Sequence, residues 1–246
     1  MIKNFKLILE YDGSAYHGWQ RQSEDRTIQG TIEQALKQLT QMDITLIGSG
    51  RTDAGVHALG QVANFHCNTK LTPQAFLAGL NSLLPDDIVI KECCEIDNDF
   101  HARYCVKSKT YAYRILNRNV PSAIYRNYTW FIQKRLDKPL MKSAIDPIIG
   151  THDFKAFEGS GSPRPHTIRY VQAAMLSEEE EDIFVFKITA NGFLKFMVRN
   201  IVGTLVEVGI GKRNPDDIKE ILLSKDRNRA GVTAPPHGLF LMSIEY

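Results

Sequence analysis

Hydrophobic positions in the first third of the chain alternate like strands and then recur at helical spacing. Residues 4–11 alternate apolar and polar side chains, which predicts a strand. Apolar positions over 28–39 recur every three or four residues behind Thr27, an expected helix N-cap. Two strands follow, at 44–48 and 60–66. A helix opened by Thr72-Pro73 extends over 72–84, and a last strand covers 87–96. This β-α-β-β-α-β order is typical of ferredoxin-like folds.

The second half of the chain predicts a similar alternation of sheets and helices. Two strands, at 109–116 and 128–132, precede a helix capped by Asp137. Two more strands, at 168–177 and 183–190, flank an acidic run. A helix at 193–209, a shorter helix opening at Asn214-Pro215 and a strand at 238–246 end the chain. We therefore predict an α+β protein of two ferredoxin-like halves, residues 1–105 and 106–246. Each half has an antiparallel sheet covered by helices on one face, and a central cleft lies where the two meet.

Composition is that of an ordinary globular protein, with 43% hydrophobic and 24% charged residues. No apolar run is long enough to cross a bilayer, and the N-terminus lacks the features of a signal peptide, so a cytoplasmic location without membrane attachment is expected. The four cysteines show no C-x-x-C spacing, which argues against a zinc ribbon or a thioredoxin-like site. We expect reduced and mostly buried thiols.

Charge is distributed unevenly although the net charge is only +2. Residues 178–182 are all acidic, and we interpret this run as a solvated hairpin tip. Segment 103–135 contains eight cations, no acid and seven aromatic residues, a mixture that suits phosphates and bases. A strand pair with aromatics inside and solvated cations outside explains it as well. In the Gly/Pro-rich loop 158–170, Arg164, His166 and Arg169 either grip a phosphate backbone or are solvated.

The stretch "GSGRTDAGVHALGQV", residues 48–62, carries one carboxylate, Asp53, among small residues. An Asp in such a loop commonly bonds nearby amides as a turn residue. Metal-dependent phosphoryl transfer and glycoside hydrolysis each need at least two carboxylates, and neither a P-loop nor an H-E-x-x-H helix is present. If Asp53 is catalytic, it acts alone as a nucleophile or proton acceptor, without a cofactor.

Six segments in order resemble the tRNA pseudouridine synthase A family: "YDGSAYHGWQRQ", "GSGRTDAGVHALGQVANF", "FHARYCVKSKTYAYRI", "GTHDFKAF", "FLKFMVRNIVGTLVEVGIG" and "GLFLMSIEY". Together they extend over essentially the whole chain. The loop near 160–170 departs from the family pattern, because His166 stands where a basic residue is expected before Thr-Ile. The resemblance implies an isomerase that detaches uracil from ribose, rotates it and rejoins it through C5.

The resemblance assigns roles to Asp53 and Tyr111, and we predict roles for Arg51 and for Arg199, a cation amid apolar helix positions that is costly unless paired. Asp53 is the catalytic aspartate, which attacks C1′, adds to C6 or takes the C2′ proton. Tyr111 stacks on the flipped base, although Tyr113 lies on the same strand face and an inward-facing aromatic is the plain alternative. Arg199 pairs with Asp53 and lowers its pKa, unless it points to solvent. Arg51 contacts RNA and displaces or replaces the flipped base.

The same resemblance implies the substrate and the assembly. The substrate is tRNA, modified in the anticodon stem-loop at positions 38, 39 and 40, and the protein is a homodimer. No metal, redox cofactor or nucleotide is expected. A non-catalytic RNA-binding protein on paired RRM-like sheets is the main alternative, and a metal-dependent phosphodiesterase is a third.

Overall fold

A computed structural model of the chain describes residues 2–161, 166–180 and 182–246. The chain packs as two units, Met1–Lys107 with Phe240–Tyr246, and Ser108–Leu239. The division expected from the sequence fell between residues 105 and 106 and left the last seven residues in the second half. They belong to the first unit because the C-terminal strand, β10 (Leu239–Glu245), pairs with a strand of that unit at His57 and Ala58.

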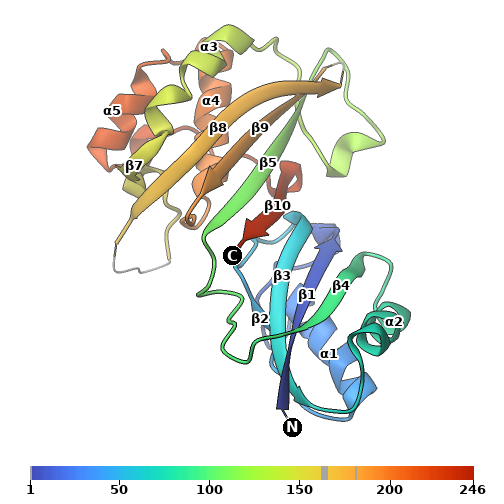
Figure 1. Cartoon of the computed structure of the whole chain (residues 1–246). Helices are drawn as coiled ribbons and strands as arrows, with labels where there is room; N and C mark the ends of the chain where they lie inside the picture. Colours follow the sequence, from blue (N-terminus) through green and yellow to red (C-terminus); the bar gives the residue numbers. More distant parts are fainter. Residues whose placement is uncertain (1, 162–165, 181) are drawn as a thin grey trace. The chain divides into compact units, whose positions relative to one another are not determined.

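The first unit has the β-α-β-β-α-β order that the sequence predicted. Its elements are β1 (Ile2–Tyr11), α1 (Ile28–Thr40), β2 (Ile47–Gly48), β3 (His57–Asn68), α2 (Pro73–Leu83) and β4 (Ile88–Ile96). The strands lie in the order β4-β1-β3-β10, with β2 also paired to β3. Helices α1 and α2 lie on one side of this sheet (Figure 1).

Aromatic packing and helix caps explain why these elements form. Phe5 on β1, Phe65 on β3 and Phe76 on α2 are fully buried, with ring centroids 4.7 to 5.4 Å apart. The cap prediction at Thr27 is confirmed, because its side chain accepts a hydrogen bond from Gly30 N at 3.3 Å. The alternating pattern of β1 and β3 therefore buries one shared face against the helices.

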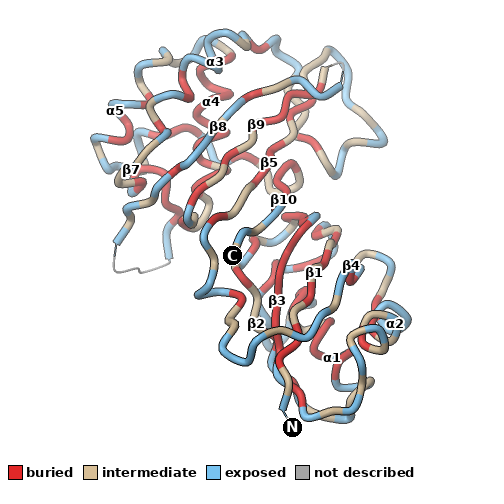
Figure 2. Tube along the Cα trace, in the orientation of Figure 1, coloured by how far each residue is buried: buried red, intermediate tan, exposed pale blue. Residues whose placement is uncertain are grey.

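The second unit is a sheet with helices packed on one side. It contains β5 (Ser108–Asn117), β6 (Trp130–Ile132), α3 (Lys138–Ser143), β7 (Gly150–Asp153), β8 (Ile168–Glu180), β9 (Ile183–Ala190), α4 (Met197–Gly209) and α5 (Asp217–Ser224). The strand order is β5-β9-β8-β7, with β6 beside β5. Figure 2 shows that β9 is largely buried, whereas most of β8 is exposed.

Single-turn 3₁₀ helices complete the described chain at Gly13–Ala15, Tyr125–Asn127, Asp146–Ile148, Phe154–Phe157, Arg227–Arg229 and Pro236–Gly238. The α+β class predicted from the sequence is confirmed. The expectation of purely antiparallel sheets is wrong, because β10 pairs with β3 in parallel and β6 pairs with β5 in parallel.

Several predicted elements have different bounds, and hydrogen bonds or backbone angles explain two of them. The strand expected over 44–48 is reduced to Ile47–Gly48, because the backbone N and O of Leu46 bond to side chains of α1 instead of a neighbouring strand. The helix expected over 193–209 begins at Met197, since Phe196 takes a left-handed conformation with φ 61°. Strand β7, which has four residues, was not predicted.

The acidic run is more structured than a solvated hairpin tip. Its first three residues end strand β8. Glu178 pairs with Lys138 at 2.6 Å, and Glu180 lies 3.5 Å from Arg114. The hydrogen bond from Lys138 lowers the pKa of Glu178. These acids therefore neutralise cations of the same unit, which the sequence pattern could not show.

The cysteines are free thiols, but the expectation that they are mostly buried is wrong for two of them. Cys67 is buried and Cys93 is half-buried, whereas Cys94 and Cys105 are exposed. Cys94 lies on β4, an edge strand of the sheet, and one edge of that strand has no neighbouring strand among the described residues.

Candidate active site

The loop that carries Asp53 connects β2 to β3 and is held by the chain segment that follows β1. Trp19 N donates to Thr52 O at 3.1 Å, and Gly55 N donates to Tyr16 O at 3.3 Å. The Tyr11 and Thr52 hydroxyls share a 2.8 Å hydrogen bond. The first and second sequence motifs therefore form one local structure, in which main-chain bonds determine the path of the loop.

Close approach explains glycines in both motifs. Gly18 has φ +88°, and a Cβ there would lie 2.6 Å from Thr52 O. A Cβ at Gly48 would lie 2.4 Å from the ring of Trp19. The space beside Gly48 is therefore filled by the indole ring, and no side chain fits there.

The start of the loop is fixed by a buried glutamine on β3. Gln61 is fully buried; its Oε1 accepts from Ser49 Oγ at 2.6 Å and its Nε2 donates to Gly50 O at 3.0 Å. Burial raises the pKa of the neighbouring Tyr11 hydroxyl well above its usual range, so this group stays protonated. The anchors on both sides of Asp53 are therefore buried and satisfied.

Asp53 itself is half-buried between buried Thr52 and exposed Ala54. Its carbonyl accepts from Val56 N at 3.1 Å, which closes the turn. Arg51 is exposed, and its Nε donates to Gln20 Oε1 at 3.0 Å. Any residue can supply the backbone carbonyl that closes the turn, so this turn explains the path of the loop, and the role of the Asp53 side chain stays a prediction.

His57, at the end of the loop, is a structural residue. Its ring is buried and stacks on Phe240 with centroids 4.7 Å apart. Its Nδ1 accepts from Gly13 N at 3.1 Å. Since the ring is enclosed by its own unit, it contributes packing to the loop.

The structure separates the two tyrosines of β5 that periodicity could not distinguish. Tyr113 is fully buried and donates its hydroxyl to Pro235 O at 2.7 Å. Burial raises the pKa of Tyr113 far above the usual range. Tyr111 is 7% exposed and meets Phe193 edge-on, with centroids 5.1 Å apart and planes at 84°. Tyr113 is thereby committed to the backbone of its unit, and Tyr111 remains the candidate.

Arg199 occupies the first turn of α4, where a cation opposes the helix dipole. The residue is half-buried; its Nε donates to Ala234 O at 2.7 Å, and Ala234 N donates back to Arg199 O at 3.1 Å. The guanidinium lies 4.7 Å from the ring centroid of Phe196. A cation at this position, behind a residue with positive φ, is an unfavourable arrangement of the kind that functional sites retain.

A polar cluster around buried Asn200, which sequence reasoning missed, holds the segment that contains Thr233 and Ala234. Asn200 Oδ1 accepts from Thr233 Oγ1 at 2.7 Å and from Arg227 Nη2 at 3.0 Å, and its Nδ2 donates to Phe157 O at 2.7 Å. Arg227 Nη1 also donates to Gly231 O at 3.0 Å. The available signal was Asn200 itself, a polar residue inside an otherwise apolar helical run.

The predicted site residues lie in both units. Asp53 and Arg51 belong to the first, and Tyr111 and Arg199 to the second. The pairing of Asp53 with Arg199 stays a prediction. Of the loop cations, Arg164 lies outside the described residues, and Arg169 donates to Ile168 O at 2.6 Å.

The basic and aromatic segment 103–135 divides between core and surface. Tyr113 is fully buried, whereas Tyr104 is 75% exposed beside the guanidinium of Arg103. Within the described ranges, no three His, Cys, Asp or Glu side chains are grouped as a metal site would require. None of the described helices has the length and apolarity that a membrane span needs.

The class of protein follows from comparison with known sequences. A family model described as tRNA pseudouridine synthase matches residues 7–105 and 144–246, well over half of the chain. The chain belongs to the tRNA pseudouridine synthase family, whose members are RNA-modifying isomerases. The resemblance found in the six sequence segments is thereby confirmed.

Individual relatives match over their full length. The chain is 51% identical over 245 residues to tRNA pseudouridine synthase A of Acetivibrio thermocellus, with 100% of both chains covered. It is 49% identical to the protein of that name from Thermoanaerobacter sp. strain X514 and 46% identical to tRNA pseudouridine synthase A 2 of Clostridium perfringens, again with complete coverage.

Proposed function

We propose that this protein converts uridine to pseudouridine in the anticodon stem-loop of tRNA, at positions 38, 39 and 40, with Asp53 as the catalytic group. Family membership supports the reaction class. The observation that carries the role of Asp53 is its half-buried position on a loop whose neighbours are anchored by buried hydrogen bonds. A fixed carboxylate needs no reorganisation when the nucleoside arrives.

The chemistry requires one acidic group and no imported atoms. The bond from N1 to C1′ breaks, a bond from C5 to C1′ forms, a proton leaves C5 and a proton is gained at N1. A carboxylate serves this reaction by attacking C1′, by adding to C6 or by taking the C2′ proton. The reactant and the product are isomers, so the reaction itself needs neither a redox cofactor nor a nucleotide.

Tyr111 is proposed to stack on the flipped uracil. Extruding a base from its stack costs a few kcal/mol, and an aromatic face offsets part of that cost. The edge-on contact with Phe193 supports this role because it fixes the plane of the phenol. Arg51 is proposed to displace or replace the extruded base from the exposed side of the loop.

Arg199 is proposed to pair with Asp53 and to keep the carboxylate ionised. A guanidinium beside a carboxylate favours the charged form and so lowers its pKa. The hydrogen bond from Nε to Ala234 O and the contact with Phe196 support this role, since they hold the guanidinium in one direction. We further propose a cytoplasmic homodimer, which sedimentation of the active species tests.

The direct experiment is incubation of the protein with unmodified tRNA transcript, without added cofactor, and mapping of pseudouridine by position. Asp53→Asn should lower the rate by about 10³-fold or more, while tRNA affinity and melting temperature stay near wild type. Asp43→Asn, an exposed carboxylate paired with Lys37, is the matched control. Product formation by Asp53→Asn at the wild-type rate would overturn the role of Asp53, and tRNA binding without product by the wild type would favour the RNA-binding alternative.

A further inference from the structure

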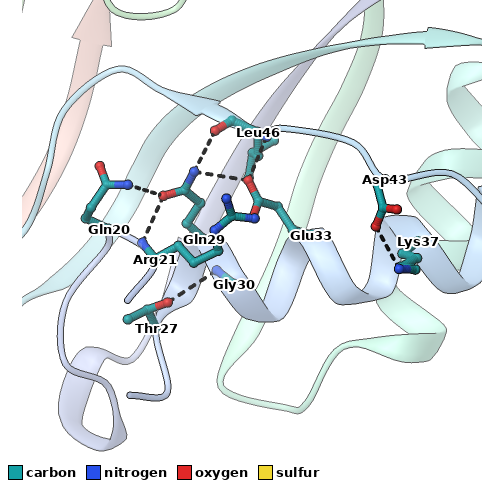
Figure 3. Close-up of polar contacts among 9 residues, drawn as sticks. All are labelled: Gln20, Arg21, Thr27, Gln29, Gly30, Glu33, Lys37, Asp43 and Leu46. Carbon is teal, nitrogen blue, oxygen red and sulfur yellow. Dashed lines mark hydrogen bonds and ion pairs between the residues drawn. The ribbon is translucent and has the colours of Figure 1, made fainter. Parts of the chain in front are cut away.

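Two buried polar side chains lie one turn apart on α1, away from the residues assigned above. Gln29 and Glu33 are each 7% exposed, and Gln29 Nε2 donates to Glu33 Oε1 at 3.0 Å (Figure 3). Burying an amide and a carboxylate is costly unless their hydrogen bonds are satisfied. Such a pair on a helix face otherwise made of Ile28, Ile32 and Leu36 calls for an explanation.

The partners of this pair come from two chain segments next to the Asp53 loop: the segment between β1 and α1, and the segment just before β2. On one side, Leu46 N donates to Glu33 Oε1 at 2.9 Å, and Gln29 Nε2 donates to Leu46 O at 3.0 Å. On the other side, Gln29 Oε1 accepts from Gln20 Nε2 and from Arg21 N, each at 2.9 Å. Arg21 Nη1 completes the carboxylate at 2.9 Å from Glu33 Oε2.

The direction of these bonds is set by the group that can only accept. An ionised carboxylate has no donor, so Glu33 requires the amide nitrogen of Gln29 to face it. The amide oxygen of Gln29 must then face Gln20, which turns the nitrogen of Gln20 inward. The oxygen of Gln20 is left facing outward, where it accepts from Arg51 Nε at 3.0 Å. Each amide orientation thus follows from the one before it.

We propose that Gln29 and Glu33 are positioning residues for the reaction, which orient Gln20 so that its carbonyl holds Arg51 beside Asp53. This inference rests on the proposed role of Arg51. With either amide reversed, the nitrogen of Gln20 would face the guanidinium, and Arg51 would lose its acceptor. This series of hydrogen bonds therefore links the buried carboxylate of Glu33 on α1 to the exposed guanidinium of Arg51 on the Asp53 loop, by fixing the orientation of each amide between them.

The neighbouring groove does not account for these side chains. It is a cavity of about 740 Å³ whose lining includes Arg21, Arg26 and Lys37. Those cations face acids at short range, Arg21 with Glu33 at 2.9 Å, Lys37 with Asp43 at 2.7 Å and Arg26 with Asp87 at 3.6 Å. The groove is therefore close to neutral and is not built for an anion.

A double-mutant cycle on tRNA modification tests the proposal. Gln20→Met removes the link to Arg51 at an exposed position, so it should lower kcat about tenfold without changing KM for tRNA or the melting temperature, an effect within the range that a misplaced group produces. Gln29→Met should lower both kcat and the melting temperature, with kcat measured far below the melting transition. In an Arg51→Ala background, neither substitution should lower kcat further.

A control variant and comparison with Arg51→Ala and Asp53→Asn decide what each result means. Lys37→Ala, on the same helix with an exposed ion pair, should change neither quantity. If Gln29→Met lowers only the melting temperature, or if its effect on kcat persists in Arg51→Ala, the pair is purely structural and the proposal is overturned. If Arg51→Ala is as active as wild type, the inference fails with the role of Arg51, while loss of activity in Asp53→Asn shows that the proposed function still stands.

Discussion

The two charged groups assigned to catalysis are held in different ways. The Asp53 loop in the first unit is fixed by main-chain hydrogen bonds, by the close approach of Gly18 to Thr52, and by the side chains of Tyr11 and Gln61. Arg199 in the second unit is placed by a side chain-to-carbonyl bond to Ala234, on a segment held by buried side chains. The position of Asp53 depends largely on backbone geometry, whereas the position of Arg199 depends on a network of polar side chains.

The difference predicts how each region tolerates change. Main-chain bonds survive most side-chain substitutions, so the Asp53 loop should be sensitive where a Cβ meets backbone and at its buried side-chain anchors Tyr11 and Gln61. A buried network loses several partners when one member is removed, so the Arg199 region should be sensitive at residues far from the reacting atoms. The predictions below test this contrast.

The largest expected effect is that of Arg199→Lys. Lysine keeps the charge but lacks the Nε donor that reaches Ala234 O and the planar group that stacks on Phe196. We expect kcat to fall about 100-fold, as for loss of an electrostatic contact in an active site. If Arg199 pairs with Asp53 as proposed, loss of the firmly placed cation should move the acidic limb of the kcat profile to higher pH. An unmoved limb would contradict the pairing.

Asn200→Ala should be the most damaging change away from the charged groups. It leaves Arg227 Nη2, Thr233 Oγ1 and Phe157 O without the bonds that Asn200 provides. The free energy of unfolding should fall by about 1–3 kcal/mol, because buried Phe157 O and half-buried Arg227 each lose a hydrogen bond, whereas exposed Thr233 can bond to water. Urea unfolding measures it, with exposed Asn228→Ala as the control. A change of less than about 0.5 kcal/mol, typical of surface substitutions, would mean that the network is not holding this segment.

Gly18→Ala and Gly211→Ala form a matched pair for the Asp53 region. Both glycines have positive φ, +88° and +74°, but a Cβ at Gly211 meets nothing within 4 Å whereas one at Gly18 meets Thr52 O at 2.6 Å. Gly211→Ala should cost about 1 kcal/mol from backbone strain alone. Gly18→Ala should cost about 1–3 kcal/mol more and also lower kcat, because the overlap displaces Thr52 and Asp53. Equal losses of unfolding free energy in the two variants would show that the Asp53 loop shifts to accept the added Cβ without strain.

The smallest effect concerns pH and Glu207, at the far end of α4. Burial by itself raises the pKa of Glu207, but hydrogen bonds from Lys212 at 2.9 Å and Arg213 at 2.5 Å outweigh it and hold the pKa below its usual value of 4.5. A depressed folded-state pKa stabilises the protein above pH 4.5, and this contribution is lost as pH falls further. Glu207→Gln should therefore flatten the acid side of a stability profile without moving the pH dependence of kcat.

Local signals in the sequence placed the helix starts well. Thr27, Thr72 and Asp137 were assigned as caps or helix openers, and each accepts a backbone N–H in the first turn of its helix. The start of α4 was misplaced because the apolar spacing of 193–209 continues through Phe196. There, Gly159 N bonds to Lys195 O at 2.8 Å, and this contact between residues 36 positions apart in sequence delays the start of the helix.

The candidate site was predictable only as far as motifs extend. Asp53 and Tyr111 came from the resemblance to the family, and Arg199 and Arg51 from their charge and position, whereas periodicity alone could not separate Tyr111 from Tyr113. The hydroxyl of Tyr113 bonds to Pro235, 122 residues away, and nothing local in "KTYAYRI" records that bond. The supporting residues Gln29, Glu33, Asn200 and Arg227 were missed for the same reason.

The sequence by itself determined the order of the elements, their capping residues, the α+β class and the family. These properties follow from side chains within a few positions of one another, or from motifs along the chain. Only the tertiary structure decided where α4 begins, which tyrosine is committed to the core, and why buried polar residues lie on α1 and α4. Those outcomes depend on hydrogen-bond partners such as Leu46 for Gln29 and Phe157 for Asn200, which folding brings together across long stretches of chain.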